Sequence, residues 1–158
     1  DKVSRWVLER PVSIRILLAV VSSILIVLVC QILVFGLGTW QIPPEWSSMA
    51  FARTNVQINP VSLRDSLMVA GMFLGTAVGA IFTESSVSYK TDGSVSHKVL
   101  RYILGIVVLF IFWMALSGAA KSHDGLGYGM SYLRAAVAGL WVTLGAPYLF
   151  LKVGLMRS

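Results

Sequence analysis

Few side chains in this 158-residue chain could do chemistry, and the two histidines, His97 and His123, are the clearest candidates. Only His123 has an acidic neighbour, Asp124, and such a pair is half of a metal site or of an acid–base pair. Zinc needs three or four ligands from Cys, His, Asp or Glu, and the sequence offers no local spacing that supplies them. We therefore interpret His123 and Asp124 as a solvated loop pair, and we predict no metal ion and no cofactor.

Three alternate glycines follow this pair, at positions 125, 127 and 129. A dinucleotide-binding loop needs the spacing Gly-x-Gly-x-x-Gly directly after a strand, and this run has neither the spacing nor the strand. Glycine also leaves the backbone unusually free. Together with Gly118, the run predicts a mobile loop over residues 117–131.

Long apolar stretches decide the fold class. Residues 16–40, 66–83, 102–120 and 135–151 carry no charge. A bilayer core about 30 Å thick is crossed by roughly 17 to 25 helical residues, and lipid offers the backbone no hydrogen-bond partners, so each stretch must be helical. Charged residues make up only 13% of the chain, against roughly 25% in soluble domains. The sequence predicts an all-α integral membrane protein: one four-helix transmembrane module over residues 1–158, with spans near 14–38, 63–83, 99–119 and 131–151.

The basic residues predict how this module is oriented. On one side of the membrane the topology places nine of them: Lys2, Arg5, Arg10, Arg15, Lys90, Lys98, Arg101, Lys152 and Arg157. On the other side it places four: Arg53, Arg64, Lys121 and Arg134. Because Lys and Arg accumulate on the cytoplasmic side, both termini are predicted to be cytoplasmic. The basic residues do not gather with aromatic residues on one polar face, so no nucleic-acid partner is expected.

Two short segments are expected to lie in the membrane interface. Residues 1–10 mix charges with apolar residues such as Trp6 and end at Pro11, which suits a short helix in the headgroup layer. Residues 45–53 lie between two proline-rich turns and predict two helical turns that place Trp46 against the membrane surface.

The second apolar stretch contains a candidate helix-packing site. Gly71, Gly75 and Gly79 recur every four residues, so they lie along one stripe of a helix and allow another helix to approach closely. In the fourth stretch, Pro147 is expected to kink the helix near its cytoplasmic end.

Ion transport is disfavoured by the polar residues of these stretches. Ionisable groups inside a membrane usually mark an ion path, and the four stretches contain none. Their strongest polar groups are Gln31, Thr76 and Thr143. Arg64 and Arg134 lie near span ends, where we interpret them as snorkelling to the interface.

Several groups of residues carry a family resemblance. They are Trp-Gln-Ile-Pro-Pro-Glu-Trp at 40–46, Ile-Asn-Pro-Val-Ser-Leu at 58–63, Ala-Gly-Met-Phe-Leu-Gly at 70–75, Lys-Val-Leu-Arg-Tyr-Ile-Leu-Gly at 98–105, Gly-Leu-Trp at 139–141 and Gly-Ala-Pro-Tyr-Leu-Phe at 145–150. In this order they resemble the carboxy-terminal membrane extension of the type 2 phosphatidic acid phosphatase family. The catalytic motifs of that family are absent: there is no Pro-Ser-Gly-His, and Ser4-Arg5 is followed by Pro11 where a histidine is needed. Lys2 and Arg10-Pro11 are separated by seven residues, where the phosphate-binding motif has six.

The resemblance implies that a catalytic core precedes Asp1 and that this chain contributes no catalytic residue. The expected function is a non-catalytic accessory module of a lipid-phosphate phosphatase, supplying helix packing and outer loops that shape lipid access. A small structural subunit that stabilises a larger membrane complex is the alternative, and a transporter or channel also stays open. Expected partners are membrane lipids and another membrane domain or subunit, in the cytoplasmic membrane of a bacterium or archaeon.

Overall fold

The described part of the chain is helical throughout. The computed structural model describes residues 2–38, 41–55, 59, 61–86, 94–118 and 125–155, and over these residues the regular elements are helices, with no strand. Four helices are long and apolar enough to cross a membrane: Val12–Gly36, Leu63–Glu84, Val95–Ala115 and Gly125–Lys152. The predicted all-α membrane fold with four spanning helices is confirmed.

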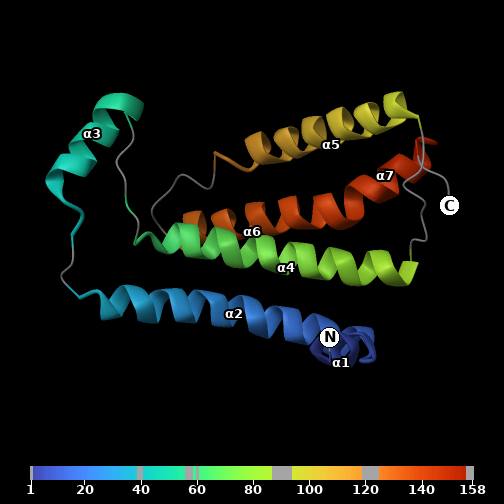
Figure 1. Cartoon of the computed structure of the whole chain (residues 1–158), viewed down its shortest axis with the longest axis horizontal. Helices are drawn as coiled ribbons and strands as arrows, with labels where there is room; N and C mark the ends of the chain where they lie inside the picture. Colours follow the sequence, from blue (N-terminus) through green and yellow to red (C-terminus); the bar gives the residue numbers. More distant parts are fainter. Residues whose placement is uncertain are drawn as a thin grey trace.

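Length and composition explain these helices. The first, α2 (Val12–Gly36), has 25 residues, which at about 1.5 Å per residue is enough to cross the hydrocarbon layer. The second and third are α4 (Leu63–Ser86) and α5 (Val95–Ala115). The fourth consists of α6 (Gly125–Leu140), a π-helical turn η2 (Trp141–Gly145) and α7 (Ala146–Lys152). Pro147 is the second residue of α7, just after this irregular turn, and Figure 1 shows the helix changing direction between α6 and α7.

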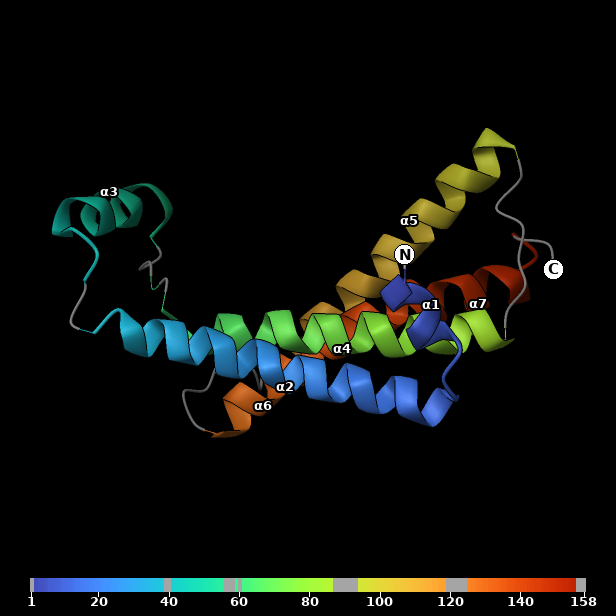
Figure 2. The same cartoon turned by 60° about the horizontal axis from the view of Figure 1, so that its bottom comes forward.

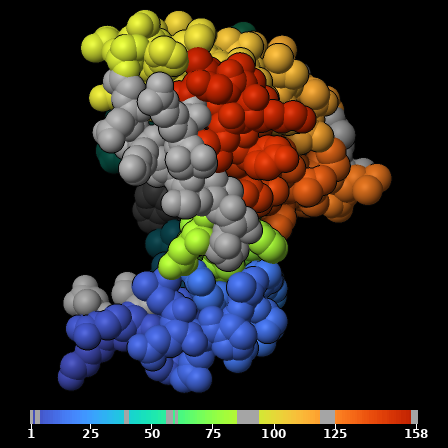
Figure 3. Space-filling view, turned by 90° about the vertical axis from the view of Figure 1, so that its right-hand side faces the viewer, coloured from blue at the N-terminus to red at the C-terminus, as the bar shows by residue number. Residues whose placement is uncertain are grey.

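The helices form an uneven bundle around α4. Figure 1 shows α4 running between α2 and α6, antiparallel to α2 and parallel to α6. Seen from the end that carries the termini, α4 lies between the amino-terminal helices and the carboxy-terminal helix (Figure 3). In contrast, α5 crosses the bundle at an angle (Figure 2), and only 6% of its most apolar window is buried. Three helices therefore make the packed core, and α5 is attached to its edge.

Two short helices lie at opposite ends of this bundle (Figure 1). At the end with the termini is α1 (Lys2–Leu8), and at the far end is α3 (Pro44–Thr54). Proline opens α3, where its missing N–H costs nothing, and Asn55 ends it with a left-handed φ of 54°. The helix predicted over 45–53 is thus confirmed, and Trp46 lies on it with 60% of its surface exposed.

The loop predicted over 117–131 is wrong in its second half. Residues from Gly125 onward are helical, and Gly127 is buried. Glycine destabilises helices in water because it exposes and frees the backbone, but in a membrane an unfolded segment has no water to bond, so glycine is tolerated. As a consequence, the fourth helix begins before the expected residue 131, and Arg134 lies well inside it. His123 and Asp124 lie outside the described residues.

Candidate helix-packing site

The face of α4 that contacts α6 is formed by its three spaced glycines. A Cβ atom added at Gly71 would overlap the backbone carbonyl of Tyr132, and one added at Gly75 would overlap that of Ala136. At Gly79 the overlap would be with the side chain of Thr143. The absence of side chains on this face lets the two backbones touch, which is how small residues pack helices in lipid.

The opposite helix contributes a glycine of its own. A Cβ at Gly139 on α6 would lie 2.6 Å from the carbonyl oxygen of Met72 and 2.7 Å from the amide nitrogen of Thr76. Each helix therefore presents backbone to a glycine of the other. Neither side of this contact has room for a methyl group.

A buried serine links α2 to the same pair of helices. Ser23 is 1% exposed, and its hydroxyl donates to the carbonyl oxygen of Ala70 at 2.9 Å. The same hydroxyl lies 2.8 Å from the hydroxyl of Tyr132 on α6. Three helices thus meet at one small side chain whose hydrogen-bonding capacity is used inside the membrane.

A threonine supports the irregular turn of the fourth helix. Pro147 has no N–H, so the carbonyl of Thr143, four residues earlier, loses its usual helical partner. The hydroxyl of Thr83 on α4 donates to that carbonyl oxygen at 2.7 Å. An adjacent helix therefore satisfies the group that proline leaves unpaired, as lipid requires.

The attachment of α5 depends on few side chains. The indole nitrogen of Trp141 donates to the carbonyl oxygen of Gly105 at 3.1 Å. The ring of Trp141 also meets Phe112 edge to face, with the centroids 5.6 Å apart. These contacts lie on the side of α5 that faces the fourth helix, and the remaining surface is left to lipid or to another protein.

Polar contacts close the end of the bundle that carries the termini. Arg15 on α2 forms an ion pair with Glu84 on α4. Arg101 on α5 is 9% exposed, and its Nε donates to the carbonyl oxygen of Leu155 at 2.8 Å. Near this surface α2 is thus joined to α4, and α5 is joined to the end of the fourth helix.

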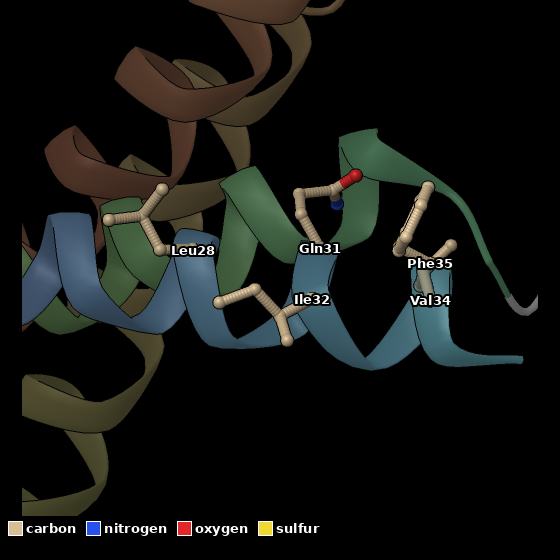
Figure 4. Close-up of a pocket in the computed structure, with 5 residues that line it drawn as sticks. All are labelled: Leu28, Gln31, Ile32, Val34 and Phe35. Atoms are coloured by element: carbon tan, nitrogen blue, oxygen red, sulfur yellow. The ribbon is translucent and has the colours of Figure 1, made fainter.

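The chemistry-bearing residues do not assemble into a reactive site. Over the described ranges, no group of three or more His, Cys, Asp or Glu residues is arranged to hold a metal ion. His97 lies in the first turn of α5, where its Nδ1 is 2.6 Å from the hydroxyl oxygen of Ser94. Gln31 lies in an open apolar groove on α2 with Leu28, Ile32, Val34 and Phe35 (Figure 4). It is remote in the fold from Thr143, which donates to Gly139 within its own helix.

A comparison with models of protein families identifies the family of this chain. The model of the PAP2 superfamily phosphatase transmembrane extension matches residues 67–158, which is more than half of the chain. The chain belongs to this family. No curated protein and no solved structure matches it.

The matched part of this PAP2 transmembrane extension contains the packing site. Gly71, Gly75 and Gly79 lie inside the match, as do α5, α6 and α7. Helices α2 and α3 precede it, so the resemblance noted at 40–46 and 58–63 lies outside the matched range. The resemblance to the phosphatase extension is confirmed by the residues from 70 onward.

Three residues of the PAP2 extension were not identified from its sequence as contacts. Ser23, Trp141 and Arg134 each join helices in the structure. A signal existed for Ser23, since a small polar residue in an apolar helix often marks a helix interface. Trp141 and Arg134 gave no comparable signal, because aromatic and basic residues near membrane surfaces usually serve as interface anchors.

Proposed function

We propose that this chain is a non-catalytic membrane module of a PAP2 phosphatase, which packs against the domain that carries the catalytic residues. The observation that carries the proposal is the family match over residues 67–158. The sequence supports the non-catalytic role, because it lacks the Pro-Ser-Gly-His and Lys-x6-Arg-Pro motifs that such phosphatases use.

The exposed surface of α5 supports packing against another membrane domain. Large apolar side chains cover this helix, and Ile103, Phe110 and Met114 are 52%, 62% and 57% exposed. Few contacts hold α5 to the rest of the bundle, so one broad face is available to a neighbouring helix. A second membrane domain could bind this exposed face of α5 without displacing the helices of the core.

The first prediction concerns activity. The purified 158-residue chain is expected to release no phosphate from phosphatidic acid or from a polyprenyl diphosphate, because it lacks the nucleophilic histidine and its phosphate-binding partners. Phosphate release is measured in detergent micelles, with a complete PAP2 phosphatase as positive control. Turnover that survives the replacement of both histidines would be assigned to a contaminating phosphatase. Turnover that is lost in His97→Ala or His123→Ala would contradict the proposal.

We also propose that the end carrying the termini faces the cytoplasm. This orientation is supported by the basic residues of that end, which include Arg10, Arg15, Lys98 and Lys152, since positive charge is retained on the cytoplasmic side. The α3 end would then lie on the outer face. There, α3 and the start of α6 would flank the path of a lipid phosphate towards an outer active site.

Accessibility labelling tests the orientation. In a Cys30→Ser background, a cysteine at Ser48 on the exposed surface of α3 is expected to react in intact cells with a membrane-impermeant maleimide. A cysteine at Ser96, near the start of α5, is expected to react only after the membrane is permeabilised. The reverse pattern would overturn the orientation and leave the helical fold unaffected.

A further inference from the structure

Arg134 carries its charge inside the fourth spanning helix. Its guanidinium carbon lies 3.9 Å from the ring centroid of Trp113 on α5, so the aromatic ring covers one of its faces. Its Nη2 lies 3.9 Å from the thioether sulfur of Met68 on α4, which is a weak acceptor. Its Nε is buried and has no acceptor. In the part of the chain that the structure describes, no carboxylate forms an ion pair with this arginine.

A second arginine faces the same space. Arg64, in the first turn of α4, is near enough to Arg134 for their charges to repel. Its guanidinium carbon lies 5.9 Å from the ring centroid of Tyr128, which lies on α6. Two cations on adjacent helices therefore lie near one another, and each has an aromatic ring beside it. In a medium of low dielectric constant the repulsion between them is costly, and an anion beside Arg134 would reduce it.

This group of residues lies near one surface of the membrane. Met68 is in the second turn of α4, and Trp113 is in the last turn of α5. Figure 1 shows these two helix ends and the start of α6 at the same end of the bundle. Side chains on a helix point towards its amino terminus, so the long Arg134 side chain extends from α6 towards that surface. Tryptophan and tyrosine prefer the headgroup level, which is also where phospholipids place their phosphates.

We propose that Arg134, with Arg64 nearby, binds the phosphate of an anionic phospholipid where α4, α5 and α6 meet. A guanidinium presents a planar fork of N–H donors that matches phosphate oxygens and can bind two of them at once. The Nε is shielded from solvent without an acceptor, and Nη2 lies against a weakly accepting sulfur, so a phosphate oxygen would supply an acceptor that these contacts do not. Basic pockets between membrane helices are known to hold anionic headgroups.

Native mass spectrometry of the full chain, released from detergent, tests the site. Phosphatidylglycerol is added to the protein at increasing concentration, and phosphatidylcholine is added in parallel. The wild type is expected to retain the anionic lipid preferentially, and Arg134→Gln is expected to bind it on the order of tenfold more weakly, the cost of one charged hydrogen bond. Arg53→Gln is the matched control: this arginine lies exposed in the last turn of α3 and should leave lipid retention unchanged.

A second measurement does not depend on the folding of the Arg134 variant. Because the Arg134 guanidinium covers the ring of Trp113, an anion that binds the arginine should shift the fluorescence of this tryptophan. Titrating wild-type protein with phosphatidylglycerol is expected to change the emission, and the change should be absent in Trp113→Phe. Glycerol phosphate and inorganic phosphate form the other arm of the titration, and they separate a free phosphate from a lipid headgroup.

Several outcomes would overturn the proposal. Equal retention of the two lipids, or unchanged retention in Arg134→Gln, would exclude an anionic lipid site at this arginine. A response to inorganic phosphate as strong as that to lipid would assign the site to a soluble anion. Loss of a co-purifying membrane protein in Arg134→Gln, with lipid binding intact, would assign Arg134 to a protein carboxylate. None of these measurements uses phosphatase activity, so the lipid site stands or fails independently of the proposed function.

Discussion

Replacing Gly75 by alanine is expected to destabilise the bundle more than any other single methyl group added to its glycines. The new Cβ would overlap the carbonyl oxygen of Ala136 and lie 2.7 Å from its carbonyl carbon, so the obstacle is backbone rather than a mobile side chain. Relief requires α4 and α6 to move apart. Such a movement would also stretch the hydrogen bond from Thr83 on α4 to the carbonyl of Thr143. It would separate the two partners of Ser23, which are Ala70 on α4 and Tyr132 on α6.

The size of this effect follows from the kind of atom that must move. Overpacking a well-filled core costs about 1–3 kcal/mol, and contact with a helix backbone places Gly75→Ala at about 3 kcal/mol or above. The cost should be somewhat smaller at Gly71, where a carbonyl group is again the obstacle but the added Cβ would approach it less closely. It should be smaller at Gly79, because the group in the way there is the side chain of Thr143.

Gly129→Ala is the matched control for this series. Gly129 lies within α6, and a Cβ there would meet nothing within 4 Å. Alanine is a better helix former than glycine by up to about 1 kcal/mol, so this variant should be neutral or stabilising. Unfolding of all variants is followed by circular dichroism as sodium dodecyl sulfate is titrated into mild micelles. Equal unfolding midpoints for Gly75→Ala and Gly129→Ala would show that the α4–α6 contact contributes nothing to stability.

The sequence predicts the helices well because lipid leaves the backbone one choice. An apolar stretch of spanning length must satisfy its own hydrogen bonds, so α2, α4 and α5 follow from composition alone. The period of the glycines likewise predicts that Gly71, Gly75 and Gly79 share a face. It does not say which helix that face meets, since any helix with small residues could approach it. Their role as a functional packing site stays a prediction for the Gly75 experiment to test.

The misplaced start of the fourth helix had a larger consequence. Glycine-rich sequence favours a loop in water, and applying that rule to 125–131 placed Arg134 at the edge of the membrane. In the structure α6 begins at Gly125, so this arginine lies more than two turns inside the helix. Charge patterns read along a sequence are sensitive to such boundaries. The interpretation of Arg134 as a snorkelling residue stays a prediction, but its side chain now starts from deeper in the helix than the sequence indicated.

The position of α5 could not be predicted, because its attachment depends on few contacts. An apolar helix has no hydrophobic reason to leave lipid for protein, so specific contacts decide where it packs. Trp141 supplies two of them, a hydrogen bond to the carbonyl of Gly105 and an edge-to-face contact with Phe112. Arg134 over the ring of Trp113 and the hydrogen bond of Arg101 to Leu155 add two more. A few side chains thus hold a helix whose surface is otherwise mostly free.

Trp141→Ala is therefore expected to release α5 from the fourth helix while the core of α2, α4 and α6 stays folded. Removing a buried tryptophan from a soluble core costs about 3–5 kcal/mol, but here lipid replaces part of the lost apolar contact, and interhelical hydrogen bonds in membranes contribute about 1–2 kcal/mol. The contacts of Trp113 with Arg134 and of Arg101 with Leu155 remain, but they lie near the two ends of α5, so even this smaller loss should free the helix between them. Helical content should not change, because the helix remains in lipid.

Pulsed electron spin resonance measures this release directly. In a Cys30→Ser background, spin labels at Ile103 on α5 and Leu133 on α6 occupy positions that are 52% and 48% exposed, so they should not disturb the packing. The wild type is expected to give one narrow distance distribution, and Trp141→Ala a broad one. Trp141→Phe keeps a ring for Phe112 but lacks the N–H donor, so an intermediate width would measure the share of the hydrogen bond. Trp46→Ala on the exposed face of α3 should leave the distribution unchanged, and a narrow distribution in Trp141→Ala would mean that other contacts hold α5 in place.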